Sequence, residues 1–139
     1  MPELPDDNYR EARRWLANVE DDLHAMRAVA RDPESPGRMA CFLAHLVTEK
    51  ALKATLIDAG VPFKKTHDLV ALHAMCTQVG RLPGVDVATL EVLDPWAVDG
   101  RYADDLAEAD HELADRLAGF AEQVVVEVRR ELGAERGRQ

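Results

Sequence analysis

The sequence predicts an all-α protein, folded as an antiparallel, up-and-down bundle of four to five helices. Apolar residues recur with a helical period over long stretches, and no strand-like alternation of useful length interrupts them. The breaks between these stretches are short, which favours helices that pack against their neighbours in sequence. At 139 residues we expect one domain, with a core from about residue 7 to 132 and a frayed tail at 133–139.

The first helix is expected to start after Asp6 or Asp7, both good N-caps, and to run to about Arg31. Residues 32–36 contain two prolines and should end it. Its apolar stripe has the helical period over five turns and consists of Ala12, Trp15, Leu16, Val19, Leu23, Met26 and Ala30.

The second helix is predicted to have Ser35 as its cap, Pro36 at its first position and Gly60 just past its end. A helical wheel at ~100° per residue predicts its apolar and opposite faces. The expected apolar face comprises Met39, Leu43, Leu46 and Ile57, with Lys50 in its middle and Phe42, Glu49 and Lys53 on its flank. The expected opposite side comprises Ala44, Thr48, Thr55 and Asp58.

The second half of the chain predicts two shorter helices and one long one. Thr66 should cap a third helix that reaches about Val79, and a short fourth helix should run from Asp86 to just before Pro95. After a loop over 96–104, Asp104 should cap the last helix. The apolar stripe of this last helix consists of Leu106, Leu113, Leu117, Phe120, Val124 and Val128.

Composition and charge exclude several classes of function. A net charge of −9 argues against broad, phosphate-driven binding of nucleic acid, but it leaves room for a local basic site. The acidic N-terminus does not resemble a signal peptide and no stretch approaches a membrane span, so we expect a cytoplasmic protein. Cys41 and Cys76 are expected to be free thiols. Neither they nor the histidines have ligand spacing, so no metal or cofactor is expected.

All four lysines fall between positions 50 and 65. Lys53 can pair with Glu49 at the i,i+4 spacing, and that structural role is at least as well supported as a functional one. Lys50 lies on the predicted apolar face, so its charge needs a partner or a ligand. Asp22 and Asp110 are the candidate partners, and structural pairing and ligand binding are equally supported by the sequence.

Lys64 and Lys65 directly precede Thr66, His67 and Asp68. Because a helix N-terminus favours an anion, this corner is a candidate phosphate site. The alternative is structural, with Asp68 supporting the first helical turn and His67 solvated.

The order of several short motifs resembles the HEPN family, named for nucleotide-binding modules of higher eukaryotes and prokaryotes. The motifs are Glu49-Lys50-Ala51-Leu52-Lys53-Ala54, Gly60, Lys65-Thr66-His67-Asp68-Leu69 and Arg101-Tyr102-Ala103-Asp104. The resemblance extends from about Trp15 to Leu117. It implies functional positions at Glu49, Lys50, Lys53, His67, Asp68, Arg101, Tyr102 and Asp104. It also implies a homodimer and a minimal nucleotidyltransferase partner in a toxin–antitoxin system; some members are metal-independent ribonucleases.

The chain departs from the family's ribonuclease pattern, in which an arginine and a histidine at the start of a late helix are separated by four to six residues. After Arg101 the next histidine is His111, with nine residues between them. Arg38 and His45 have the right spacing but lie on the second helix, so we interpret that pair as a coincidence. His67 remains a candidate substitute beside Arg101, which could otherwise clamp an anion or form salt bridges within its acidic loop.

These observations favour a nucleotide- or RNA-phosphate-binding module that acts with a nucleotidyltransferase, and ribonuclease activity that is absent or very weak. The alternatives are a metal-independent endoribonuclease toxin and a structural helical adaptor.

Overall fold

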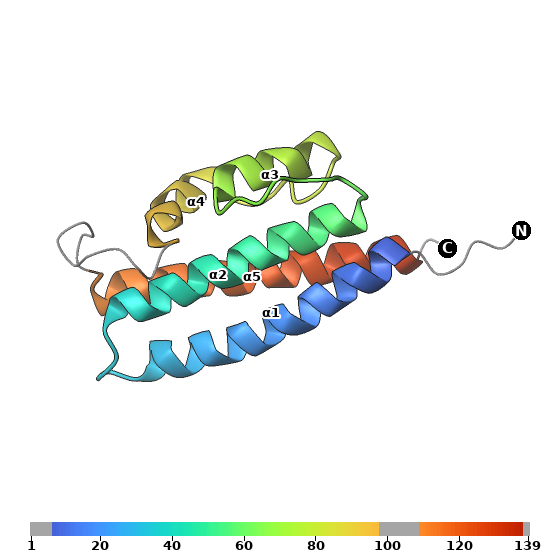
Figure 1. The fold of residues 1–139 in the computed structure, drawn as a ribbon. Coiled ribbons are helices and arrows are strands. Elements are labelled where there is room, and N and C mark those ends of the chain that lie inside the picture. The colour runs from blue at the N-terminus through green and yellow to red at the C-terminus, as the bar shows by residue number, and fades with distance from the viewer. Residues whose placement is uncertain (1–6, 98–108, 138–139) are drawn as a thin grey trace, which may run out of the picture.

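The computed structural model describes residues 7–97 and 109–137 of the chain, and it is helical throughout these ranges apart from short connections (Figure 1). No strand occurs in the described residues, so the predicted all-α bundle is confirmed. The elements are α1 (Asp7–Arg31), α2 (Gly37–Asp58), α3 (Leu69–Gln78), α4 (Val87–Leu93), the single 3-10 turn η1 (Asp94–Trp96) and α5 (His111–Gly137).

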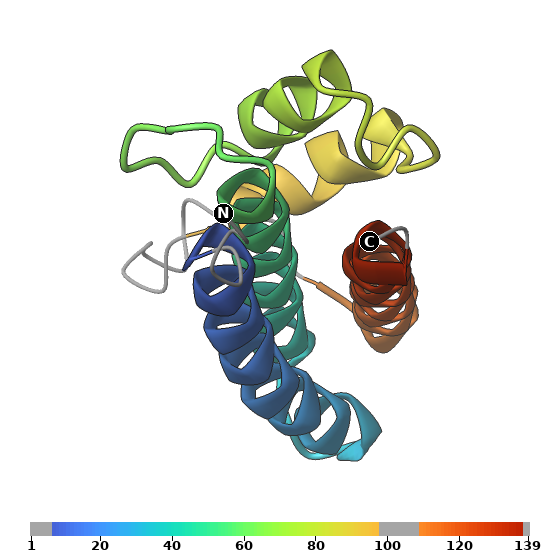
Figure 2. The same ribbon diagram turned by 90° about the vertical axis from the view of Figure 1, so that its right-hand side faces the viewer.

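Helix α2 is the centre of the bundle. It packs most extensively against α1 and α5, and it also contacts α3, α4 and η1 (Figures 1 and 2). The predicted faces of this helix were therefore wrong: Ala44, Thr48 and Thr55 are fully buried, whereas Met39 is exposed. A helix with neighbours on several sides has no single apolar stripe, and its small residues let the neighbouring helices approach closely.

Helix α1 carries the apolar stripe that the sequence predicted, and so does α5 from Leu113 onward; Leu106, the first residue of the predicted stripe of α5, lies outside the described residues. In α1 the stripe is buried except for Trp15 and Ala30, which are partly exposed. The two helices run antiparallel, since Arg27 pairs with Glu122 near one end of α1 and Glu20 pairs with Arg129 further back. None of the described helices combines the length and the hydropathy needed to cross a bilayer.

Two predicted helix starts need correction. Ser35 does not cap α2, because its hydroxyl donates to Asp32 and the N-cap position is Pro36. The helix begins at Gly37. This position requires glycine, because a Cβ there would collide with the carbonyl oxygen of Ala109. Asp104 lies outside the described residues, and the chain is still non-helical at 109–110.

Helix α5 instead begins at His111, where the Asp110 carboxylate accepts a 2.8 Å bond from the Leu113 N–H and satisfies a free donor of the first turn. His111 itself is exposed.

Other predicted ends are confirmed. Gly60 follows α2 with a φ of +71°, and the N–H of Val61 donates to the Leu56 carbonyl at 2.9 Å, which is a glycine-terminated helix end. Asp86 caps α4 by accepting from the Thr89 N–H.

The prediction for Trp96 was wrong. It was expected in a loop, but it belongs to η1 and is buried.

Candidate functional site

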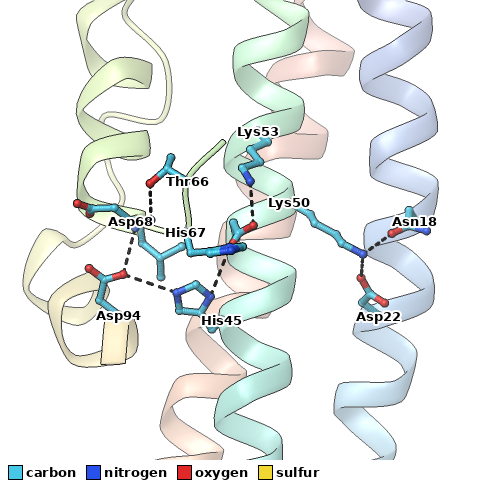
Figure 3. Close-up of polar contacts among 11 residues, drawn as sticks. Asn18, Asp22, His45, Lys50, Lys53, Thr66, His67, Asp68 and Asp94 are labelled. Carbon is cyan, nitrogen blue, oxygen red and sulfur yellow. Dashed lines mark hydrogen bonds and ion pairs between the residues drawn. The ribbon is translucent and has the colours of Figure 1, made fainter. Parts of the chain in front are cut away.

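The central helix carries three polar side chains, one turn apart, on a face that is otherwise buried. His45, Glu49 and Lys53 follow one another at i,i+4 spacing, which places them on one side of α2. Each residue is less than a tenth exposed. His67 and Asp94 approach them from the α2–α3 connection and from η1 (Figure 3). We call these five residues the Glu49 cluster.

Glu49 uses both carboxylate oxygens inside this cluster. Its Oε2 accepts a 2.9 Å hydrogen bond from Lys53 Nζ, so the predicted pair is confirmed. Its Oε1 accepts a 2.9 Å hydrogen bond from His67 Nδ1. The Lys53 ammonium also lies 5.9 Å from the centre of the Phe63 ring. A buried carboxylate is tolerable only with such partners, because removing an ion from water is costly.

His45 lies between two carboxylates without a hydrogen bond to either. Its Nδ1 is 3.7 Å from Glu49 Oε1 and its Nε2 is 3.6 Å from Asp94 Oδ1, both beyond good bonding distance. Nε2 is buried and has no hydrogen-bond partner among residues 7–97 and 109–137, and the same is true of the Thr48 hydroxyl. Burial lowers the pKa of His45 although both carboxylates act to raise it.

Lys50 is held on the opposite side of α2 from α3. Its Nζ donates to Asp22 Oδ2 at 2.7 Å and to Asn18 Oδ1 at 2.6 Å, both on α1 (Figure 3). Asp22, one of its two predicted partners, is therefore confirmed. Asp110, the other, caps α5 instead. The charge of Lys50 is used to join two helices.

Lys64 and Lys65 lie in the connection 61–68 between α2 and α3, and both are exposed. Within the part of the chain that the structure describes, neither forms a salt bridge. These two lysines differ from Lys50 and Lys53, whose charges are matched by Asp22 and Glu49.

The first turn of α3 is arranged differently from the prediction. Thr66 is not its cap; the cap is Asp68, which accepts from the Ala71 N–H at 3.0 Å, while Thr66 Oγ1 accepts from the Asp68 N–H. The Leu69 N–H donates to Asp94 Oδ1 at 3.1 Å. Two carboxylates therefore occupy donors that an anion could have used. Asp68 therefore has the structural role that the sequence allowed, which is to support the first turn of α3.

The remaining predicted residues are not brought into the cluster. Arg101, Tyr102 and Asp104 lie outside the described residues. Arg38 is exposed, two turns of α2 away from His45, which is buried. An imidazole without access to solvent or substrate cannot transfer a proton to RNA, so the geometry does not assemble this pair into a catalytic site.

Asp94 was missed by the sequence analysis, and so was the position of His45 in the cluster. The spacing 45–49–53 is a regular polar stripe and could have indicated a buried polar seam. Asp94 precedes Pro95, a pair typical of turns. Nothing in the sequence connects Asp94 to His45, which lies 49 positions earlier.

Two other kinds of reactive site have little support. No group of three or more His, Cys, Asp or Glu side chains in residues 7–97 and 109–137 is arranged to hold a metal ion. Burial raises the pKa of the Cys41 thiol to about 11 and that of Cys76 to about 12, so both stay protonated and unreactive near neutral pH.

Comparison with known proteins places this arrangement in a family. The family model for the HEPN domain matches residues 12–131. The bundle is similar to the crystal structure of ST0689, an archaeal HEPN homologue, with a TM-score of 0.67, 22% identity, and coverage of 87% of this chain and 97% of that one. It is also similar to the crystal structure of TT1696 from Thermus thermophilus, with a TM-score of 0.67, 23% identity, and coverage of 86% and 96%.

No curated protein matches the chain. At these identities the structural similarities establish the shared fold only. The family match spans most of the sequence, including α1, α2, α3 and the motifs Glu49-Lys50-Ala51-Leu52-Lys53 and Lys65-Thr66-His67-Asp68. The chain belongs to the HEPN domain family.

Proposed function

We propose that this HEPN domain binds the phosphate groups of a nucleotide or of single-stranded RNA through the connection 61–68. The observation that carries the proposal is the contrast among the four lysines. Lys50 and Lys53 are neutralised by Asp22 and Glu49, whereas Lys64 and Lys65 project from the connection without an acidic partner in the described structure. A phosphate group would supply the missing negative charge.

His67 supports the same surface. Its side chain is 60% exposed while its Nδ1 is fixed by Glu49, so the other edge of the ring faces solvent two positions after Lys65 in the sequence. The exposed nitrogen of the neutral ring can accept a hydrogen bond from a ribose hydroxyl, and the protonated ring can donate one to a phosphate oxygen. The net charge of −9 limits the attraction to this local patch, so binding should be modest and sensitive to salt.

The test is a calorimetric titration of the protein with nucleoside triphosphates and with a short single-stranded RNA. The double variant Lys64→Ala with Lys65→Ala should lose about 2 kcal/mol of binding free energy, because each exposed phosphate contact contributes about 1 kcal/mol. The fold should be unaffected, since both side chains are exposed.

A matched control removes two positive charges elsewhere. Arg31 on α1 and Arg116 on α5 are exposed and lie toward the end of the bundle where α2 begins, away from the connection, and Arg31→Ala with Arg116→Ala changes the net charge by the same amount. This control should bind as the wild type does. Equal weakening in both double variants would show that only net charge matters, and unchanged binding in Lys64→Ala with Lys65→Ala would place the site elsewhere.

We further propose that the domain acts as a homodimer with a minimal nucleotidyltransferase in a toxin–antitoxin-type system, a proposal that rests on its family. Sedimentation at micromolar concentration should give about twice the 15.4 kDa chain mass. The partner should co-purify when the two proteins are expressed together. A monomer at all concentrations, or a nucleotidyltransferase that elutes alone, would contradict these assignments.

The proposed module is a binder without strong catalysis. The histidine with the spacing of a ribonuclease motif, His45, is buried, and the exposed His111 lies at the start of α5, separated from Arg101 by nine residues. Purified protein in chelator should therefore leave a fluorescent RNA intact. Cleavage that disappears with Arg101→Ala or His67→Ala would instead indicate an endoribonuclease.

A further inference from the structure

His67 differs from the other histidines in how its two nitrogens are used. Nδ1 lies 2.9 Å from Glu49 Oε1, and a carboxylate can only accept, so Nδ1 carries the ring proton. The lone pair of the neutral ring is then on Nε2. No protein group among the described residues bonds to that nitrogen, and the side chain is 60% exposed. The carboxylate that fixes the ring is itself only 8% exposed.

We propose that Nε2 of His67 is a phosphoryl-acceptor site, modified by high-energy phosphoryl donors such as phosphoramidates and acyl phosphates. This inference goes beyond phosphate binding and does not require RNA to be the ligand. A nucleophilic imidazole needs a free, exposed lone pair and a group that stabilises the positive charge which develops on the ring. His67 has the first at Nε2 and the second in Glu49.

The four other histidines each lack one of these features. His45 and His73 are buried, and His73 Nε2 bonds to the Leu82 carbonyl oxygen at 2.8 Å. His24 and His111 are exposed but have no carboxylate partner within the described structure. The same chain therefore contains two exposed histidines that serve as internal controls for the effect of Glu49.

Charges around His67 suit an incoming phosphoryl group. Lys64 and Lys65 lie three and two positions before it, and both are exposed and without salt bridges in the described residues. Lys53 binds the other oxygen of Glu49 and offsets the repulsion that this carboxylate would exert on an anion. Asp68, the nearest acid in the sequence, is directed to the N-terminus of α3 as its cap.

The chemical step balances without a metal or a redox partner. With phosphoramidate as donor, the Nε2 lone pair attacks phosphorus, an N–P bond forms, and the bond from phosphorus to the donor nitrogen breaks. Ammonia leaves and takes a proton from solvent. The ring then carries a positive charge. Its Nδ1–H still donates to Glu49, and this hydrogen bond strengthens as the charge develops. The product places a phosphoryl dianion beside Lys64 and Lys65.

The experiment treats the full-length protein with potassium phosphoramidate and follows each histidine by peptide mass spectrometry and phosphorus NMR. His67 should be phosphorylated about tenfold faster than His24 or His111, the factor expected from one charge-assisted hydrogen bond retained in the transition state. His67→Asn should remove this fast phase and leave the slow modification of the other two.

The Glu49→Gln variant tests the positioning role. Its His67 should react at the rate of His24, while the rates at His24 and His111 stay unchanged. Circular dichroism establishes that the variant is folded; if it is not, the comparison among the three histidines of the wild type still decides the matter. Modification of His67 no faster than that of His24 and His111 in folded wild-type protein would overturn the proposal, whatever the RNA titrations show.

Discussion

Helix α3 is held by a charged cluster at each end, and the two clusters are built differently. At its C-terminal end Arg81 donates to Glu131 and to Asp58, both at 3.0 Å, and the Leu82 N–H donates to the second oxygen of Glu131 at 2.8 Å. We call these residues the Arg81 clamp. It joins α2, the α3–α4 connection and α5, and its guanidinium is 12% exposed.

At the N-terminal end of α3, the Glu49 cluster is incompletely bonded. His45 Nε2 has no hydrogen-bond partner, and His67 turns one edge of its ring to solvent. A buried polar network with all its hydrogen bonds made rigidifies a fold. A partly bonded network costs stability, so its presence calls for an explanation such as a ligand or a function. We interpret the Arg81 clamp as structural, and the exposed ring edge of His67 in the Glu49 cluster as support for the binding that we propose.

Backbone geometry agrees with this interpretation of the clamp. Among the residues that the structure describes, Leu82 is the one non-glycine residue with a positive φ, which is 53°. Its N–H is held by Glu131 and its carbonyl by His73. A leucine in this conformation costs on the order of 1 kcal/mol, so the bonds around it have to fix the turn.

The largest effect is expected at the clamp. Arg81→Ala removes the guanidinium that bonds to the buried Asp58 carboxylate and to Glu131, and should lower the free energy of unfolding by about 3–5 kcal/mol. Urea denaturation followed by circular dichroism measures this loss. RNA affinity of the folded fraction should not change. A loss below 1 kcal/mol would remove the distinction between the two clusters.

A smaller loss is expected at Glu49. Glu49→Gln keeps the side-chain shape and a hydrogen-bond acceptor but leaves Lys53 buried without an anion, so we expect a destabilisation of about 1–3 kcal/mol. The matched control is Glu127→Gln, which weakens an exposed pair with Arg130 and should stay within about 0.5 kcal/mol. Equal effects of the two changes would argue that burial of Glu49 has no energetic consequence.

The pH dependence sharpens the contrast further. Burial lowers the pKa of His45 below its ordinary 6.5 in the folded state, although Glu49 on α2 and Asp94 on η1 oppose this shift; His67 adds to it. The unfolded chain therefore binds the extra proton first as the pH falls. The stabilising contribution is fully present above pH 6.5 and is lost as the pH falls from there toward the lower folded pKa.

His45→Gln should flatten this part of the stability profile, by up to about 1.4 kcal/mol per pH unit. His24→Gln, at an exposed position, is the control and should keep the wild-type slope. A wild-type profile that gains stability between pH 7 and 5 would show that the two carboxylates outweigh burial at His45.

The fold was largely predictable because its signals are local. The stripe of α1, the glycine at the end of α2 and the Asp86 cap each involve residues within a few turns of one another. Predictions failed where tertiary packing decides the outcome. A helix wheel could not show that α2 is covered on several sides, or that the approach of Ala109 favours Gly37 at its start.

The site was predictable only in part, for the same reason. The Lys53–Glu49 pair follows from spacing, and Asp22 was one of two partners proposed for Lys50. The position of Asp94 opposite His45, and the clamp from Arg81 to Glu131 50 residues further on, depend on how distant elements pack. No local pattern encodes such a contact, so sequence reasoning found the partners of Lys50 and Lys53 and missed the Asp94–His45 contact and the Arg81 clamp.

The most direct test of the central claim is the salt dependence of RNA binding. Log affinity for a single-stranded RNA is measured against log salt concentration for the wild type and for Lys64→Ala with Lys65→Ala. If both lysines contact phosphates, the magnitude of the slope falls by about 1.4 in the variant, since each contact on single strands contributes about 0.7. The Arg81→Ala protein, if folded, keeps the wild-type slope. An unchanged slope in the lysine variant would contradict the assignment of phosphate binding to the connection between α2 and α3.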